Sequence, residues 1–198
     1  MGIRVYHLPP SRSTRVVWAL EELGVEYDVT LLTREEKAQE EYKRTVHPLG
    51  RVPAIDDGQG PVFESLAICL HLADLHPEGG LNWPAGTHER ALVYQWASFA
   101  MTELEPPIME AWRYEDHPDV VEKATERFRS AATVLEQALA GKEFLVGDRF
   151  SIADLTLGAV VGFGRRRGLL GDDFPNCLAY DDRLVARPAR VRANEVGG

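Results

Sequence analysis

The first part of the chain switches between two hydrophobic periodicities. Apolar residues alternate with polar ones from Ile3 and again from Tyr27 to Leu31, a spacing typical of strands. Between them, apolar residues from Val16 to Leu23 recur at helical spacing, and Gly24 stands where a glycine commonly ends a helix. The pattern predicts strand, helix and strand over residues 3–31, and a connection of this length implies that the two strands are parallel.

A second set of elements follows a highly charged segment, residues 33–46, which indicates a short irregular helix. Residues 51–55 have the pattern of a strand that Pro53 interrupts, and Val62-Phe63 starts another short strand. Helical periodicity then runs from Ser65 to His76. The order βαβ-ββα predicts a small α/β sandwich.

The composition changes at residues 77–88, which are rich in proline and glycine and therefore typical of a linker. Beyond the linker the pattern predicts only helices. Their expected ranges are 88–104, 106–114, 119–140, 152–169 and 175–187. The sequence thus predicts an α/β domain over residues 1–78, a linker over 79–87 and an all-helical domain over 88–198.

One predicted helix start is unusually clear. Ser151 and Asp154 have the spacing of a capping box, in which each residue's side chain bonds to the other's backbone N–H. Phe150 and Leu155 stand where a hydrophobic staple places its two apolar residues. This pattern indicates where a helix begins, and we do not interpret it as part of a catalytic site.

Composition and charge narrow the function classes. The chain has 198 residues, of which 44% are hydrophobic and 27% charged, so it is long enough for a substantial core. The net charge of −9 opposes binding to nucleic acid or to an anionic membrane. The only dense basic run is Arg165-Arg166-Arg167, and the ordinary interpretation of three arginines there is a solvated helix face.

The cysteine spacing and the lack of targeting patterns favour a protein of the reducing cytoplasm. Cys69 and Cys177 form no CxxC pair, which argues against a disulfide scaffold or a structural zinc site. The N-terminus has no signal-peptide pattern, and Tyr6 stands where a myristoylation motif requires Ser or Thr. No apolar run approaches the ~20 residues of a membrane span. We therefore expect a cytoplasmic protein without membrane or nucleic-acid partners.

Four motifs occur in order along nearly the whole chain. They are Tyr6-His7-Leu8-Pro9-Pro10-Ser11-Arg12-Ser13 with the helix up to Gly24, His47-Pro48-Leu49-Gly50-Arg51-Val52-Pro53-Ala54-Ile55, Phe63-Glu64-Ser65 with Ala67-Ile68, and Phe144-Leu145-Val146-Gly147-Asp148 with Ser151, Ala153 and Asp154. Each motif alone is weak, but together and correctly spaced they resemble the cytosolic glutathione transferase family. Within that family, the chain resembles bacterial, serine-type members with a theta- or delta-like first domain.

The resemblance implies a thioredoxin-like domain followed by a helical bundle. It implies glutathione as co-substrate, a hydrophobic electrophile as second substrate, and no prosthetic group. It also implies a homodimer, by analogy alone. The predicted reaction is conjugation of the glutathione thiolate to an electrophilic small molecule.

The resemblance places the glutathione-binding residues in two turns. Ser65 would hold the γ-glutamyl carboxylate at a helix N-terminus, and Glu64 would pair with the ammonium group of the same head. Pro53 is cis in the family, and the Val52 backbone would pair with the cysteinyl residue of glutathione. Without the flanking motifs, Ser65 would be a helix cap and Glu64 a surface acid.

The thiol must become a thiolate to react, and a hydroxyl donor can favour that form. The resemblance gives this role to Ser11, as hydrogen-bond donor and not as nucleophile. Ser13 is the alternative, because the Ser-Arg-Ser spelling permits a shift of two positions; Tyr6 and a backbone N–H complete the candidates. The ordinary interpretation of both serines is capping of the first helix.

The remaining contacts leave several candidates. The glycine carboxylate of glutathione needs a cation or a strong donor, for which the candidates are Arg12, Lys37, His47 and Arg51. The electrophile site is expected between the domains, and Met109 and Trp112 are the leading candidates. Further candidates, all of which fit an ordinary core equally well, are Met101, Glu103, Pro106 and Tyr114.

Other interpretations have less support. The spacing His71-x-x-Asp74-x-His76 suggests a metal site, but a polar helix face explains it better. Glutathione-dependent thiol–disulfide exchange or peroxidase activity would need a cysteine near Ser11, and the sequence has none there. A non-catalytic glutathione-fold binding protein would tend to lose the activating side chain or the Glu-Ser turn, and both are present.

Overall fold

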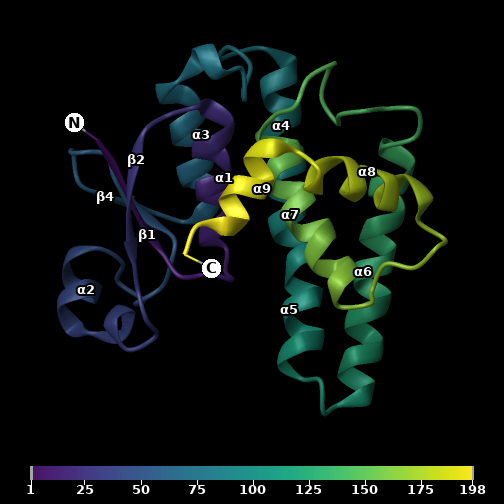
Figure 1. Ribbon diagram of the computed structural model, residues 1–198. Helices are drawn as coiled ribbons and strands as arrows, with labels where there is room; N and C mark the ends of the chain where they lie inside the picture. The colour runs from purple at the N-terminus through teal and green to yellow at the C-terminus, as the bar shows by residue number, and fades with distance from the viewer. Residues whose placement is uncertain (1, 198) are drawn as a thin grey trace. The chain divides into compact units, whose positions relative to one another are not determined.

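A computed structural model describes residues 2–197 of the chain (Figure 1). The chain divides into two compact units, one formed by Met1–Asn82 with Arg187–Gly198 and the other by Trp83–Ala186. The first unit has a thioredoxin-like α/β fold and the second is helical, which confirms the predicted fold class.

The first unit is built on a four-stranded sheet with the order β2-β1-β3-β4 within the described residues. Its strands are β1 (Ile3–His7), β2 (Tyr27–Leu31), β3 (Ala54–Asp56) and β4 (Pro61–Phe63). β1 is parallel to β2, with Ile3 opposite Tyr27, as the sequence predicted. β3 begins one residue after Pro53 and not at residue 51, since a proline cannot donate a hydrogen bond to the ladder.

Two helices provide the apolar partner of the sheet in the first unit. They are α1 (Ser13–Leu23) and α3 (Ser65–Leu75), which pack on each other, and a 3₁₀ turn at Pro77–Gly79 follows. The buried side chains of α1 include Val16, Trp18 and Leu20. Cys69 of α3 is buried as predicted, and burial raises the pKa of its thiol to about 12, so it is an inert core residue.

The charged segment forms a 3₁₀ turn (Glu36–Ala38) and the short helix α2 (Glu40–Thr45). Its one buried residue, Tyr42, meets the ring of Tyr6 edge-on at 5.7 Å between centroids. Tyr6 alternates along β1 with the buried Val5 and His7, so α2 packs against the sheet face opposite theirs.

The C-terminal helix α9 (Pro188–Glu195) was not predicted, and it belongs to the first unit. It packs along α1, as Figure 1 shows, and Arg187 just before it forms a two-pronged ion pair with Glu22, with nitrogen–oxygen distances of 2.6 and 2.7 Å. The sequence had assigned all of residues 88–198 to the helical domain. The difference arises because α9 is mostly polar and its partners are distant in the sequence.

The second unit contains only helices within the described residues. They are α4 (His88–Phe99), a π-helical turn (Ala100–Leu104), α5 (Glu105–Arg113), α6 (Pro118–Ala138), α7 (Ile152–Arg166) and α8 (Pro175–Val185). α7 is the central helix, because every residue from Ile152 to Gly162 is buried. Every helix in residues 2–197 is too short or too polar to serve as a membrane span.

The basic run at the end of α7 is neutralised by acidic side chains. Arg165 pairs with Asp181 and Asp182 at 3.0 and 2.5 Å, and Arg167 pairs with Glu115 at 3.0 Å. This run is therefore part of an ion-paired helix surface and not a patch for an anionic polymer.

The predicted capping box is present at the start of α7. Asp154 Oδ2 accepts from the N–H and the hydroxyl of Ser151, each at 2.9 Å. Its Oδ1 accepts from the Leu145 N–H at 2.9 Å and from the Tyr180 hydroxyl at 2.8 Å. Burial raises the pKa of the Asp154 carboxyl, while the four hydrogen bonds act in the opposite direction. One carboxylate thus ties α7 to the preceding loop and to α8.

We predict that Asp154→Ala destabilises the protein by about 3 kcal/mol or more, because it removes a helix cap and leaves buried donors of Ser151, Leu145 and Tyr180 without an acceptor. Chemical denaturation measures the loss. Asp148→Ala, at an exposed position nearby, is the control and should change stability by less than about 0.5 kcal/mol. If the two substitutions lowered the stability equally, the hydrogen bonds of Asp154 would not make the large contribution predicted here.

Candidate functional site

The loop between β1 and α1 carries both candidate serines. Ser11 is half-buried, whereas Ser13 is completely inaccessible to solvent. Ser13 Oγ lies 2.6 Å from His7 Nδ1 and 2.7 Å from Ser11 Oγ, and it accepts from the Leu8 N–H at 3.2 Å. Ser13 therefore lies behind Ser11, and in this arrangement only Ser11 can meet a ligand.

The ordinary capping role of these serines is partly present. Ser11 Oγ accepts from the Ser13 N–H at 3.1 Å, so it satisfies one of the free amides at the start of α1. This bond also holds the Ser11 oxygen at the positive end of the α1 dipole. A helix cap and a hydroxyl placed for chemistry are compatible here, since the hydrogen of Ser11 is not used by that bond.

The second part of the site is the segment that leads into β3. The Val52–Pro53 peptide bond is cis, as the resemblance implied, and so is the Pro9–Pro10 bond. Within residues 2–197, the N–H and C=O of Val52 have no hydrogen-bond partner. The preceding residue is tied down instead, because the Arg51 carbonyl accepts from the Tyr42 hydroxyl at 2.8 Å. The Val52 backbone is thus available to an extended ligand.

The turn before α3 contains the one non-glycine residue with positive φ among residues 2–197, Glu64, at φ 75° and ψ 113°. Such a conformation costs about 1–3 kcal/mol and persists only where the surroundings impose it. The Glu64 carbonyl accepts from the Ile68 N–H at 2.9 Å, which starts the helix. The first amides of α3, from Ser65 onward, therefore have no partner within the helix and form an anion-binding end.

These two turns enclose a small cavity of about 40 Å³. Its lining residues are Arg12, His47, Arg51, Val52, Pro53, Glu64 and Ser65. This volume suits a charged head group, and a longer ligand would extend over the open surface. The fold thus brings together all five residues that the sequence nominated for glutathione, along with two of the cationic candidates. Lys37 does not line the cavity, and its ammonium donates to the Gly50 carbonyl at 3.2 Å.

His47 contributes a neutral donor to the cavity. The Leu49 N–H donates to its Nδ1 at 3.2 Å, so the single hydrogen of the neutral ring lies on Nε2. The ring lies against Phe63, with 4.8 Å between centroids. Burial lowers the pKa of His47, although the charge of Glu64 opposes that shift. The positive charge at the cavity therefore comes from Arg12 and Arg51.

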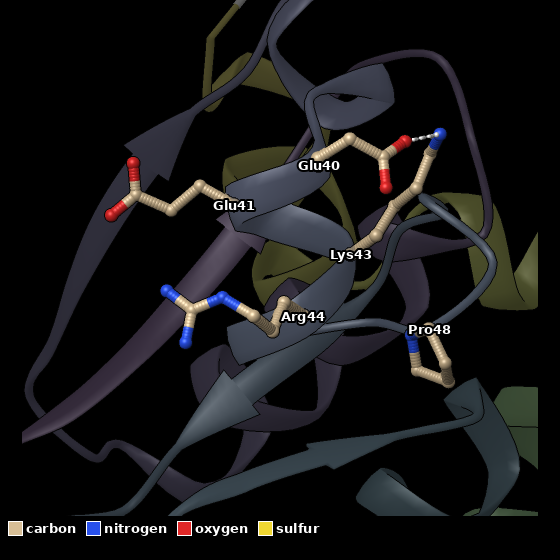
Figure 2. Close-up of a pocket in the computed structure, with 5 residues that line it drawn as sticks. All are labelled: Glu40, Glu41, Lys43, Arg44 and Pro48. Atoms are coloured by element: carbon tan, nitrogen blue, oxygen red, sulfur yellow. Dashed lines mark hydrogen bonds and ion pairs between the residues drawn. The ribbon is translucent and has the colours of Figure 1, made fainter.

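A larger hollow of about 710 Å³ lies beside α2. Its lining residues are Glu40, Glu41, Lys43, Arg44 and Pro48. Figure 2 shows that Glu41 and Arg44 both extend to the left of the helix with no interaction drawn between them, and the one interaction drawn is the Lys43–Glu40 ion pair at 2.7 Å. The lining side chains carry charges of both signs and do not converge on one point. We therefore do not consider this hollow a candidate binding site.

The two leading electrophile-site candidates lie on α5 of the second unit. Trp112 is 48% exposed, its ring meets Phe163 edge-on at 6.2 Å, and the Arg167 guanidinium lies 5.8 Å from its centre. Met109 is half-buried on the same helix. An exposed aromatic ring that is held from two sides forms a flat apolar surface.

The suggested metal spacing on α3 forms no metal site. His71 Nε2 pairs with Asp57 at 2.8 Å, and His76 pairs with Glu78 at 3.3 Å. Among residues 2–197, no group of three or more His, Cys, Asp and Glu side chains is arranged to hold an ion. Each histidine instead contacts a separate carboxylate.

Sequence reasoning missed His7 and the C-terminal segment. His7 is fully buried, and its Nε2 lies 3.1 Å from the carbonyl oxygen of Val196. The available signal was a polar residue at an inward-facing position of an alternating strand, in line with Ile3 and Val5. The partner at Val196 had no signal, because it is 189 residues away along the chain.

Comparison with known proteins identifies the family of the chain. Residues 1–74 match the glutathione S-transferase N-terminal domain, and residues 118–183 match the C-terminal domain. The chain is 32% identical to the probable glutathione S-transferase GSTF1 of Oryza sativa subsp. japonica, over 91% of this chain and 90% of that protein. It therefore belongs to the glutathione S-transferase family, and it is a glutathione transferase.

Solved structures show the same fold over nearly the whole chain. A glutathione transferase from Methylococcus capsulatus str. Bath has a TM-score of 0.89 and 29% identity, with 98% of each chain covered. Ure2p in complex with glutathione has a TM-score of 0.87 and 25% identity, with 97% of each chain covered.

We predict that Glu64→Gly is more stable than Glu64→Ala by about 1 kcal/mol, because glycine adopts a positive φ without steric cost whereas alanine retains the strain. The pair is matched, since both substitutions remove the same side chain. Urea denaturation of the two variants measures the difference. If alanine were equally well tolerated, the backbone at Glu64 would not be strained.

Proposed function

We propose that the first unit binds glutathione across the Val52 and Glu64–Ser65 turns, and that the Ser11 hydroxyl stabilises the glutathione thiolate for conjugation to an electrophile. The observation that carries this proposal is the different accessibility of the two serines. Ser13 is completely buried behind Ser11, while Ser11 stays half-exposed at the N-terminus of α1.

The charges around the cavity suit the tripeptide. Glutathione presents two carboxylates and one ammonium group. The amides at the start of α3, with the buried Ser65, favour the γ-glutamyl carboxylate, and Glu64 favours the adjacent ammonium. Arg12, Arg51 and the Nε2–H of His47 are the donors for the glycine carboxylate. The free N–H and C=O of Val52 would pair with the cysteinyl backbone between them.

Activation of the glutathione thiol needs only a modest fall in its pKa. A thiol with a pKa of ~8.5 is about 3% ionised at pH 7. A hydrogen bond from Ser11 and the positive end of α1 both favour the thiolate, and a fall of ~2 pKa units would ionise most of it. The thiol proton leaves to solvent. The thiolate then forms a carbon–sulfur bond to the electrophile, whose leaving group departs with the electron pair.

The alternative of thiol–disulfide exchange has little structural support. It needs an accessible cysteine of low pKa. Cys69 and Cys177 are both buried, and burial raises the pKa of each thiol. A non-catalytic binding function would use the same cavity, so it differs from the proposal only in the role of Ser11.

Three further assignments follow from the family and complete the proposal. Met109 and Trp112 would contact the hydrophobic electrophile, since Trp112 offers an exposed flat face. The protein would work in the cytoplasm and as a homodimer, as the resemblance implies. Sedimentation at micromolar concentration tests the dimer.

We predict that Ser11→Ala lowers turnover with a chlorodinitrobenzene-type substrate at least about tenfold, while the Kd for glutathione changes by only a few fold. The hydroxyl would act on the sulfur and not on the tripeptide head. Steady-state kinetics and titration calorimetry measure the two effects. Ser130→Ala, on the exposed side of α6, is the matched control. An unchanged rate in Ser11→Ala would remove Ser11 from the mechanism.

We predict that Glu64→Gln weakens glutathione binding about tenfold, because an amide keeps the shape of the side chain but loses the charge that would face the ammonium. Calorimetric titration of glutathione measures the change. The exposed Glu122→Gln on α6 controls for the loss of one negative charge. Equal affinity of the two variants would mean that Glu64 does not contact the ligand.

A further inference from the structure

Tyr42, the buried residue of α2, contacts the segment before β3 through two different groups. Its backbone carbonyl accepts from the N–H groups of Val46 and His47, at 2.9 and 3.1 Å. Its side-chain hydroxyl donates to the Arg51 carbonyl at 2.8 Å. A single residue thus holds both the beginning and the end of the loop that leads to the cavity.

The Tyr42 hydroxyl is a fixed donor in this contact. A carbonyl oxygen can only accept, so the hydrogen comes from the tyrosine. Burial and the neighbouring Tyr6 raise the pKa of Tyr42 to about 12, so the hydroxyl keeps its hydrogen at neutral pH. Tyr42 is only 7% exposed, and its ring packs edge-on against Tyr6, which prevents the hydroxyl from turning away.

The peptide group between Arg51 and Val52 carries the effect of this contact to the cavity. Their bond is not among the cis peptide bonds of residues 2–197, so it is trans. In a planar trans peptide, the C=O and the N–H point in opposite directions. Since the Arg51 carbonyl is directed at Tyr42, the Val52 N–H is directed away from Tyr42. Val52 lines the cavity and Tyr42 does not, so the tyrosine acts from behind the binding surface.

We propose that Tyr42 is a positioning residue for glutathione: its hydroxyl fixes the Arg51–Val52 peptide group so that the Val52 N–H is presented to the cysteinyl carbonyl of the tripeptide. The inference rests on the proposed binding of glutathione at Val52. It adds a residue of α2 that makes no contact with the ligand and yet sets its affinity.

Two effects of the hydroxyl favour binding. It fixes the rotation of a peptide group in a loop, which reduces the conformational entropy that is lost when the ligand binds. It also polarises the peptide group, because a peptide whose C=O accepts a hydrogen bond donates more strongly through its N–H. The cysteinyl carbonyl takes no part in the reaction, so its bond to Val52 is the same in the ground state and the transition state. Loss of the hydroxyl should therefore raise the KM for glutathione and leave kcat unchanged.

Tyr42→Phe tests the inference, since it removes one oxygen and keeps the ring that packs on Tyr6. Calorimetry and steady-state kinetics should show a rise of about fivefold in the Kd and KM for glutathione, with kcat within about twofold of the native value. Tyr27→Phe is the matched control, because it removes a hydroxyl that donates to Glu21 at 2.7 Å in the same unit, and neither residue lines the cavity. Its Kd for glutathione should equal that of the native enzyme.

Two truncated ligands locate the effect within the tripeptide. γ-Glutamylcysteine lacks the glycine but keeps the cysteinyl carbonyl oxygen in its carboxylate, so Tyr42→Phe should raise its Kd about fivefold as well. γ-Glutamylcysteamine keeps the γ-glutamyl head and the thiol but has no cysteinyl carbonyl. Its Kd should change by less than about twofold, because the Val52 N–H has no acceptor in this ligand.

Three outcomes would overturn the inference. Native glutathione affinity in Tyr42→Phe would mean that the hydroxyl does not act on the ligand. An equal loss for all three ligands would mean that the whole cavity is disturbed. A loss for glutathione alone would mean that the tyrosine acts through the Arg51 side chain on the glycine carboxylate. Failure of the proposed function is recognised separately, because glutathione affinity would then be unchanged in Glu64→Gln too.

Discussion

The first unit depends on the buried hydroxyl of Ser13, where the central strand passes into the first helix. Its oxygen meets the ring of His7, the backbone of Leu8 and the hydroxyl of Ser11 within 3.2 Å. A buried hydroxyl is costly without partners, so the loop conformation that satisfies it is strongly preferred. The same requirement places Ser11 at the surface, beside the positive end of α1.

The site combines two kinds of local order. Among residues 2–197, the first amides of α3 and the backbone of Val52 lack partners within the fold, which leaves them available to a ligand. The Ser11 loop is the reverse case, since its polar groups are satisfied by one another. In the proposed function, binding would rely on these backbone groups, whereas activation would rely on the Ser11 side chain.

The second unit shows the same use of a buried polar group. Asp154 accepts four hydrogen bonds from Ser151, Leu145 and Tyr180, and so it joins a helix start, a loop and a second helix. A buried carboxylate is tolerated when all its acceptor positions are used. Each unit therefore contains one buried oxygen-bearing side chain that connects segments at different positions along the chain.

The sequence by itself determined the βαβ-ββα order, the helical second half and the capping box, and it singled out five residues that meet at one cavity. Those features depend on local periodicity and on motifs of a few residues, which a single segment encodes. Only the tertiary structure decided that Ser13 is buried behind Ser11, that α9 belongs to the first unit, and that His7 bonds to Val196. These depend on burial and on contacts between the two ends of the chain, and no local pattern records either of them.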